Sequence, residues 1–268
     1  MELDIYQVDS FTSVPFKGNP AGVCITENEL DESLMFSIAE EMAVSETAFL
    51  SVSNMRLRWF TPKVEVNLCG HGTLAVAHIL KENGFVSCGE TLMFDTLSGA
   101  LSVTVQDKTI DMDFPSATIS TVVDDHATLL EHLGINPNNV VFFGRFDAKF
   151  IIEIDSNDRL LDLNPNFDGL KALPGRGVVV TAKSPSNEVD FVSRYFAPWV
   201  GVNEDPVTGS AHCALAVYWQ GKLNKNRLKG YQASARGGFV EVELLDNKRV
   251  KLIGSAVTTL KGKICISE

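Results

Sequence analysis

Two short segments of this sequence each combine glycine with side chains that can exchange a proton. The first, "CGHGTLAVAHIL", begins at Cys69, and the second, "EDPVTGSAHCALAVYW", begins at Glu204. Each starts as a glycine-containing turn and continues as a run of small and apolar residues. The first N–H groups of a helix lack internal partners and its dipole is positive there, so such a turn suits a carboxylate or phosphate. The alternative is that glycine and serine serve only as caps and packing spacers.

The two segments belong to a longer internal repeat. "RWFTP" at 58–62 recurs as "RYFAP" at 194–198, an offset of 136 residues, and Cys69 aligns with Thr208 at an offset of 139. The hairpin-like stretches that follow, "SGALSVTVQDKTIDMDF" and "GGFVEVELLDNKRVKLI", also keep an offset of 139. Three matches in the same order favour a duplication. For a pair of matched turns we favour a ligand site over simple caps.

The helices that follow the two turns are expected from about Gly72 to Asn83 and from about Ser210 to Leu223. Both are apolar on nearly every face, which is typical of a helix buried on all sides. A further amphipathic helix is expected from Leu34 to Met42. Alternating or continuous apolar runs predict strands at Leu3–Val8, Ala21–Thr26, Thr47–Val52, Leu57–Phe60, Thr91–Phe94, Ala100–Val105, Ile110–Phe114, Phe150–Ile154, Gly177–Thr181, Asp190–Phe196, Phe239–Leu245 and Arg249–Ile253.

Many strands around one buried helix in each half predict an α+β fold of two pseudo-symmetric lobes. Each lobe is expected to be a β-barrel-like sheet wrapped around its central helix. The lobes are assigned to residues 1–115 and 116–268, with one chain end allowed to cross to the other lobe. The segment Asp113–Asp125 is the expected connection. Pseudo-two-fold symmetry would then let the two helix N-termini face each other across a cleft.

The composition narrows the classes of partner. With 268 residues, 45% of them hydrophobic, the chain can form a large core, and its net charge of -11 makes nucleic acid or an anionic membrane an unfavourable partner. No signal peptide is visible, and no apolar run reaches the ~20 residues of a membrane span. The five cysteines are scattered and lack C-x-x-C spacing, which favours reduced thiols in a cytoplasm over disulfides or structural zinc.

Glu46 is the candidate proton carrier, because it stands at the start of the apolar strand in "VSETAFLSV". Burying a carboxylate is costly unless it has a partner or a task, and partial burial would raise its pKa towards neutrality. An offset of 136 makes Ala182 its counterpart, so only one half would carry the carboxylate. The alternative is a glutamate at a strand edge that points into water.

Three further side chains flank the turns. His71 lies in the first turn, and Asp205 and Ser210 flank the second. The alternative interpretation is structural: His71 would be a helix-capping histidine, Asp205 a solvated loop carboxylate and Ser210 an N-cap. The chain lacks a G-x-S-x-G elbow, a P-loop and a G-x-G-x-x-G fingerprint, and His71 and His78 lack helical i, i+4 zinc spacing. Nothing in the sequence demands a metal or an organic cofactor.

The segments "DSFTSVPFKGNPAGV", "SETAF", "CGHGTLA", "EDPVTGSAHC" and "GGFVEVE" together resemble the PhzF, or phenazine-biosynthesis-like, family. That family resembles diaminopimelate epimerase and proline racemase in fold. The resemblance extends over essentially the whole chain. It implies two lobes, each with a central helix, an active site between them, and a homodimer.

The resemblance also implies roles for individual residues. Glu46 matches the general acid/base of the family, and His71, Asp205 and Ser210 match residues that contact the substrate and assist proton transfer. Asn19 is a candidate substrate contact by analogy with the epimerases. The expected ligand-binding positions at the two helix mouths are Cys69, Gly70, Gly72, Thr73, Thr208, Gly209 and Ala211.

The sequence departs from the two-thiol epimerases at one of these positions. Cys69 stands at the first thiol position, but Thr208 occupies the second and is far too weak an acid to replace a thiol. We therefore expect a cofactor-independent isomerase in which Glu46 moves a proton between carbons of a small carboxylate substrate. Two alternatives remain: a catalytically silent ligand-binding or regulatory protein on the same fold, and an epimerase or racemase that uses Cys69.

Overall fold

The computed structural model describes residues 1–122 and 126–266, and the chain divides into two compact units. Unit 1 consists of Met1–Phe114 together with Lys251–Glu268, and unit 2 consists of Pro115–Val250. The C-terminal segment therefore belongs to the unit that the N-terminus begins. Part of the expected connection at Asp113–Asp125 forms strands, and its last three residues lie outside the described part of the chain.

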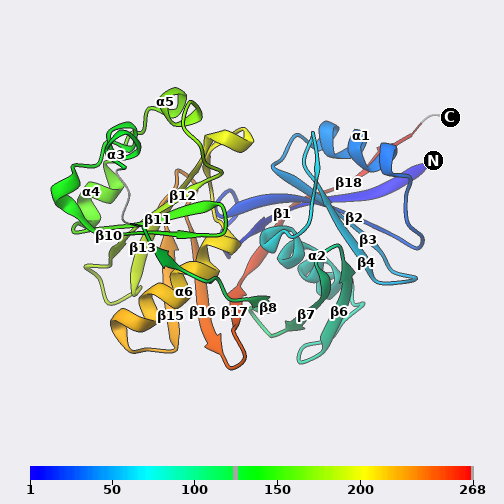
Figure 1. Cartoon of the computed structure of the whole chain (residues 1–268). Coiled ribbons are helices and arrows are strands. Elements are labelled where there is room, and N and C mark those ends of the chain that lie inside the picture. Colours follow the sequence, from blue (N-terminus) through cyan, green and yellow to red (C-terminus); the bar gives the residue numbers. More distant parts are fainter. Residues whose placement is uncertain (123–125, 267–268) are drawn as a thin grey trace. The chain divides into compact units, whose positions relative to one another are not determined.

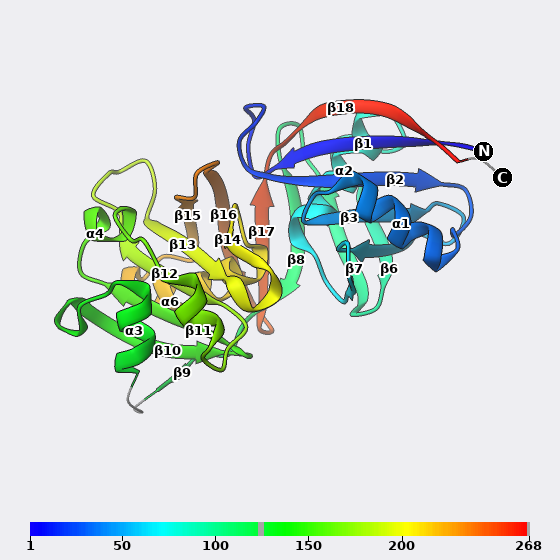
Figure 2. The ribbon, with the colours of Figure 1, turned by 90° about the horizontal axis from the view of Figure 1, so that it is seen from above.

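Unit 1 is a curved, mostly antiparallel sheet that holds two helices, α1 (Glu32–Met42) and α2 (Gly70–Glu82). Its strands are β1 (Glu2–Ser10), β2 (Asn19–Thr26), β3 (Glu46–Ser51), β4 (Arg56–Phe60), β5 (Glu65–Val66), β6 (Thr91–Thr96), β7 (Gly99–Val105), β8 (Ile110–Pro115) and β18 (Ala256–Cys265). β1 pairs antiparallel with both β2 and β18, so the two ends of the chain lie side by side (Figures 1 and 2). β2 and β3 run parallel, and α1 connects them.

The central helix of unit 1 is α2, which the strands enclose (Figure 1). It packs against β1, β2, β3, β7 and β18. Leu74, Val76 and Ile79 are completely buried although they point to different sides of the helix. This confirms the prediction of a helix buried all round, because only an apolar helix can be enclosed without stranding polar side chains. The helix ends at Glu82 with Asn83 as its C-cap, and Gly84 adopts the left-handed conformation that commonly follows a helix.

Unit 2 repeats this arrangement around α6 (Gly209–Leu223), which packs against β15 and β16. Its strands are β9 (Ser120–Thr121), β10 (Val140–Phe146), β11 (Lys149–Ile154), β12 (Val178–Lys183), β13 (Phe191–Ala197), β14 (Val202–Asp205), β15 (Arg227–Gln232), β16 (Gly238–Leu245) and β17 (Arg249–Gly254), which crosses the unit boundary. Shorter helices form an outer layer: α3 (Ala127–Leu133), α4 (Asn157–Leu161), α5 (Phe167–Lys171) and the 3₁₀ turns Pro137–Asn139 and Pro198–Val200. An apolar core that includes Leu133, Ile152 and Phe196 lies between them and the sheet.

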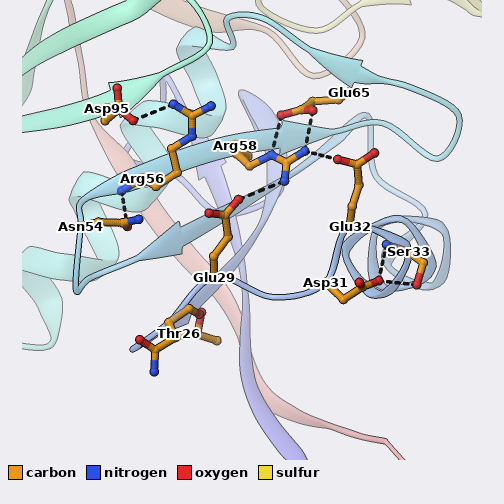
Figure 3. A network of polar contacts seen from close by, with 11 residues as sticks. Thr26, Glu29, Asp31, Glu32, Ser33, Asn54, Arg56, Arg58, Glu65 and Asp95 are labelled. Carbon is orange, nitrogen blue, oxygen red and sulfur yellow. Dashed lines mark hydrogen bonds and ion pairs between the residues drawn. The ribbon is translucent and has the colours of Figure 1, made fainter.

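The internal repeat predicted from the sequence appears as a repeated polar contact. In unit 1, Arg58 donates from Nε and Nη2 to the two carboxylate oxygens of Glu65, each at 2.7 Å (Figure 3). In unit 2, Arg194 makes the same two-pronged contact with Glu204, at 2.8 and 2.9 Å. Each guanidinium also lies over the phenylalanine two residues later, Phe60 or Phe196. A shared bidentate geometry at matched positions supports a duplicated unit.

The strand register corrects one alignment. In unit 1, Phe49 pairs with Arg58, and in unit 2, Val180 pairs with the matching Arg194. By the same register the counterpart of Glu46 is Gly177, so the prediction of Ala182 was wrong. The turn between β12 and β13 is longer than the turn between β3 and β4. The offset of 136 that relates Arg58 to Arg194 after the turn therefore does not hold for residues before it, such as Glu46. The conclusion that only one unit carries the carboxylate still holds.

Several elements were not predicted. β14, β15 and β18 contain glycine or polar residues and lack a clear apolar alternation, and β18 is held by pairing with β1 at the opposite end of the chain. β18 therefore depends on a distant partner, whereas β14 and β15 pair with the neighbouring strands β13 and β16. Among the described residues, none of the helices has the length and apolar character needed to cross a bilayer.

Candidate functional site

In unit 1, Glu46 and His71 meet at the N-terminal end of α2. Glu46 is the first residue of β3, and its Oε2 lies 3.2 Å from Nε2 of His71, the second residue of the helix. The side chain of His71 is 8% exposed and that of Glu46 is 21% exposed. The contact joins a strand and a helix that are far apart in sequence. Glu46 therefore has a partner and is not a glutamate pointing into water.

Nearby groups fix the position of His71. The Ser10 hydroxyl donates a 2.7 Å hydrogen bond to the His71 carbonyl, which anchors the first turn of α2 to the end of β1. Ser45 Oγ lies 3.3 Å from His71 Nε2, and Cys69 Sγ lies 3.4 Å from Nδ1. Contacts at both ring nitrogens and at the backbone leave the imidazole little freedom to turn.

The carboxylate and the imidazole stabilise each other's charged form. Burial raises the pKa of Glu46, but hydrogen bonds and charge attraction from His71, with a further bond from Ser45, outweigh burial and leave the pKa below its usual value. Burial lowers the pKa of His71, yet the hydrogen bonds to Cys69 and Glu46 and the negative charge of Glu46 hold it well above its usual value. The prediction that burial would raise the Glu46 pKa towards neutrality was therefore wrong. Desolvation is present as expected, but the partner that the sequence does not reveal reverses its effect.

Cys69 is the N-cap of α2 and stays a thiol. Its Sγ accepts a hydrogen bond from the Gly72 N–H at 3.4 Å, and its carbonyl accepts one from the Thr73 hydroxyl at 2.7 Å. Burial raises the pKa of Cys69 above its ordinary value, although His71 pulls in the opposite direction. A neutral, buried thiol with a capping task is a poor base. Cys69, Gly72 and Thr73 therefore shape the helix mouth rather than supply its charge.

The glycine at position 72 permits a close approach. A Cβ added there would lie 2.8 Å from Cδ1 of Trp59 and 3.1 Å from the Cys69 sulfur. Gly70, the first residue of the helix, is half-buried. Gly72 therefore lets Trp59 of β4 pack directly onto the first turn of α2, which holds that turn against the sheet.

Asn19 lies at the same end of unit 1. It is fully buried at the start of β2 and pairs in register with Ser10, whose hydroxyl holds the His71 carbonyl. The parallel register of β2 and β3 places Ala21 beside Glu46. The structure thus places Asn19, Glu46 and His71 at the same end of unit 1.

The Glu46, Cys69 and His71 ligand atoms lie within 4.8 Å of one another, a separation that raises the question of a metal ion. The carboxylate faces Nε2, whereas the sulfur lies nearer to Nδ1, at 3.4 Å, than to Nε2, at 4.0 Å. A metal on one ring nitrogen at about 2.0 Å would thus reach the carboxylate or the sulfur but not both without a side-chain movement. The arrangement suits a proton-sharing pair better than a metal site.

In unit 2 the residues expected from the sequence gather at the N-terminal end of α6. The Thr208 hydroxyl donates a 2.5 Å hydrogen bond to Asp205 Oδ2, while Gln232 accepts from the Thr208 N–H and donates to the Asp205 carbonyl. Thr208 is the N-cap position, but its side chain caps no amide in the described structure. The glutamine, which the sequence gave no reason to select, fixes the loop between β14 and α6.

Ser210 is the exposed position of this helix mouth, whereas its neighbours Gly209 and Ala211 are buried. Its Oγ accepts a 2.9 Å hydrogen bond from Nζ of Lys149, the first residue of β11. Lys149 was not predicted. The available signal was a lysine directly before the apolar stretch "FIIEI", but that pattern is common at strand ends and does not identify a site.

His212 and Cys213 are structural. His212 is fully buried, its Nδ1 lies 2.9 Å from the Thr208 carbonyl, and burial lowers its pKa to about 4. Burial raises the pKa of Cys213 to about 12. A neutral histidine and a neutral thiol inside the helix cannot exchange protons with a ligand near pH 7.

Comparison with known proteins identifies the class. The family model described as "Phenazine biosynthesis-like protein" matches residues 8–262. An uncharacterized isomerase of Halalkalibacterium halodurans is 48% identical, over 99% of this chain and 100% of the relative. The chain therefore belongs to the PhzF, or phenazine-biosynthesis-like, family, as its motifs indicated.

Solved structures agree with this assignment. The crystal structure of a PhzF-family protein from Enterococcus faecalis has a TM-score of 0.91 and 39% identity, over 99% of this chain and 100% of that chain. A hydroxyproline epimerase from Agrobacterium vitis has a TM-score of 0.63 at 10% identity, over 98% of this chain and 92% of that chain, which shows a shared fold alone. The predicted diaminopimelate epimerase-like fold is confirmed, and the relatives named as isomerases support the expected enzyme class.

Proposed function

We propose that this protein is a cofactor-independent isomerase that moves a proton between carbons of a small carboxylate-bearing substrate. The observation that carries the proposal is the buried contact of 3.2 Å between Glu46 and His71. A carboxylate that stays ionised inside an enzyme can accept a proton from a C–H group. It can then return that proton to another carbon of the same substrate.

His71 supports both halves of this cycle. While Glu46 is ionised, the imidazolium holds it in place through Nε2, and the Ser45 side chain adds a hydrogen bond to the carboxylate. When Glu46 has taken the proton, the charged imidazolium remains to stabilise negative charge on the substrate. Because the histidine keeps Glu46 a weak base at rest, binding of the substrate must supply part of the driving force for proton abstraction.

A single proton carrier explains the difference between the units. The counterpart of Glu46 is Gly177, and a Cβ there would lie 2.1 Å from the Tyr195 hydroxyl. Burial also raises the pKa of Tyr195 above its ordinary value, so this hydroxyl is not a ready base. Thr208 replaces the second thiol of a two-thiol epimerase. We therefore propose that the same carboxylate removes and returns the proton, which gives isomerisation rather than racemisation.

The remaining positions are proposed as the substrate-binding set. His71, Asp205 and Ser210 assist proton transfer or contact the substrate, as their match to the family motifs suggests. The residues at the two helix N-termini offer backbone N–H groups to the substrate or leave space for it, and Asn19 makes a polar contact with it. A cytoplasmic location, suggested by the scattered free thiols, and a homodimer, suggested by the family resemblance, are also part of the proposal.

The test compares Glu46→Gln with Glu41→Gln, which alters an exposed carboxylate on α1. Small cyclic and linear amino and hydroxy acids are screened for binding and for solvent-deuterium uptake at carbon. Glu46→Gln should lower deuterium uptake by roughly 10²- to 10⁴-fold while binding changes little, and Glu41→Gln should match the wild type. Full deuterium uptake in Glu46→Gln would sink the proposal. Binding without deuterium uptake and without any isomerised product in the wild type would favour the catalytically silent alternative, because a proton that Glu46 returns before it exchanges with solvent leaves no deuterium.

The alternative that uses Cys69 is tested separately. Cys69→Ser keeps a side chain able to accept the Gly72 N–H, so the helix cap survives. Because the Cys69 thiol is neutral and buried, we expect deuterium uptake to stay within roughly tenfold of the wild type. Loss of uptake in a folded Cys69→Ser protein, measured under the same conditions, would instead support an epimerase or racemase that uses this thiol.

A further inference from the structure

Two side chains inside unit 2 bury a polar atom that has no protein partner. Ser193 of β13 and His212 of α6 are both completely buried. Among the residues that the structure describes, neither Oγ of Ser193 nor Nε2 of His212 has a hydrogen-bond partner. Buried polar atoms in folded proteins almost always bond to the protein or to an internal water, because leaving them unsatisfied is unfavourable. Neither residue belongs to the catalytic or substrate-binding set proposed above.

The two side chains face the same space between α6 and the sheet. The centroid of the Phe191 ring lies 6.1 Å from that of His212 and 5.9 Å from that of Trp219, so this side of α6 faces β13. Ser193 follows Phe191 by two residues on the same strand, and its side chain therefore points to the same face of the sheet. The serine thus points towards the side of α6 that carries His212.

The strands on both sides of Ser193 are also attached to this side of α6. Ser193 pairs in register with Thr181 on β12 and with Gln232 on β15. Thr181 accepts a 3.0 Å hydrogen bond from Nε1 of Trp219. Gln232 accepts a 2.9 Å bond from the N–H of Thr208, whose carbonyl the buried histidine contacts. The neighbours of Ser193 therefore hold the helix turns before and after this histidine.

The internal repeat supports the closeness of the two side chains. One residue before the matched arginines, Ser193 corresponds to Leu57, and the offset of 139 matches His212 to Thr73. All four residues are completely buried. Unit 1 thus combines a large strand residue with a small helix residue, and unit 2 combines a small strand residue with a large helix residue. Such an exchange of bulk is expected of side chains that share one space, because protein interiors are close-packed.

The tautomer of His212 defines what its second nitrogen can bind. Nδ1 lies 2.9 Å from the Thr208 carbonyl, which can only accept, so Nδ1 carries the proton and Nε2 is an acceptor. The hydroxyl of Ser193 has a proton to donate, yet the two atoms make no direct hydrogen bond. A water molecule can join them, because it accepts from a hydroxyl and donates to a nitrogen at the same time.

We propose that one internal water molecule binds between Ser193 and His212, against the first turn of α6. The water accepts a hydrogen bond from the serine hydroxyl and donates one to Nε2. Its third partner is Oε1 of Gln232, which accepts one other hydrogen bond and has a second lone pair. The water thereby ties the first turn of α6 to β13. In unit 1 the corresponding place is occupied by the apolar Leu57, which offers no hydrogen bond to a water.

The first experiment is a crystal structure of the full-length protein. It should show one ordered water at about 2.5–3.2 Å from both Ser193 Oγ and His212 Nε2. The double variant Ser193→Leu with His212→Thr, which copies unit 1, should lack this water. A wild-type structure in which the serine bonds the histidine directly, or in which no water joins them, overturns the proposal.

The second experiment is a double-mutant cycle measured by urea unfolding at pH 7. Ser193→Leu displaces the water, leaves Nε2 unpartnered and crowds the imidazole, so it should raise the unfolding equilibrium constant by roughly 10- to 100-fold. Adding His212→Thr should recover most of this loss, because the pair then matches Leu57 and Thr73. Ser193→Val replaces Ser193→Leu in the cycle if the leucine variant does not fold.

The matched control combines Ser193→Leu with Cys213→Ala. Cys213 is the next residue of α6 and is buried on another side of the helix, so its effect should add to that of Ser193→Leu and recover none of the loss. If Ser193→Leu and His212→Thr are also simply additive, the two side chains do not share a space and the proposal is overturned.

Discussion

The N-terminal ends of α2 and α6 have a common design and different chemistry. In unit 1 the helix mouth holds a buried carboxylate–imidazole pair, and in unit 2 it holds a lysine in contact with an exposed serine. In both units a bidentate arginine–glutamate contact at matched positions joins two strands that precede the central helix, Arg58 with Glu65 and Arg194 with Glu204. The duplication therefore preserved the arginine–glutamate contacts of the two units, whereas the side chains at the two helix mouths diverged.

The largest expected effect breaks the charge pair of unit 1. In His71→Gln, burial of Glu46 is no longer offset by an imidazolium, so the pKa of Glu46 should rise above its usual 4.5. Activity in the wild type needs ionised Glu46 and protonated His71. It should therefore persist below pH 4.5 and decline only above the raised His71 pKa.

In the variant, turnover should fall roughly 10²-fold or more and the acidic limb of the pH–rate profile should move upward. The measurement is deuterium uptake against pH for the wild type and His71→Gln, with Glu41→Gln, which alters an exposed carboxylate on α1, as the control. An unchanged acidic limb in His71→Gln would show that the pair does not set the charge state of Glu46.

The next effect concerns two matched residues inside the helices. Thr73 in α2 and His212 in α6 both contact the carbonyl of the N-cap residue four positions earlier, but only the histidine can titrate. The folded-state pKa of His212 is about 4, against 6.5 for the ordinary group. Between these values the unfolded chain binds more protons, so stability is full above pH 6.5 and falls as the pH is lowered towards 4.

This single group should remove about 3 kcal/mol of the free energy of unfolding across that window. The measurement is urea unfolding between pH 6.5 and 4 for the wild type and His212→Thr, which copies unit 1. The variant should lose part of the pH dependence, whatever its stability at pH 7. An identical pH dependence in the two proteins would mean that His212 is not kept neutral by burial.

The smallest effect compares the two arginines. Arg194 also donates from Nη1 to the carbonyls of Leu160, Leu161 and Leu163, whereas the extra partners of Arg58 are the more exposed Glu29 and Glu32 (Figure 3). Losing Arg194 leaves backbone carbonyls without their donor. Losing Arg58 mainly frees surface carboxylates, whose contacts contribute little in water.

Arg194→Ala should therefore lower the free energy of unfolding by about 3 kcal/mol and Arg58→Ala by about 1–2 kcal/mol. Chemical unfolding of both variants at one pH measures the difference, and 1 M salt should narrow it little. Equal losses would imply that the two supports are equivalent and that the loop after α4 does not depend on Arg194.

Much of the fold follows from local sequence. The predicted strand beginning at Thr47 and the two apolar helices match β3, α2 and α6 closely, because periodicity and apolar content are local properties. The strands β14, β15 and β18 were missed because their own sequences lack a clear apolar alternation, and β18 in addition pairs with β1 at the other end of the sequence. The wrong counterpart of Glu46 has a similar origin, since a longer turn shifts a register that an offset alone cannot track.

The candidate site, like the fold, was predictable from the sequence only in part. The sequence by itself determined which residue types stand at the two helix mouths, that the chain is duplicated, and that Thr208 cannot act as a second thiol. Only the tertiary structure decided that Glu46 touches His71 and that Lys149 touches Ser210. It also decided that the Glu46 pKa falls rather than rises. The physical reason is that charge states depend on distances between groups from separate elements, and the packing of the sheet around its helix sets those distances.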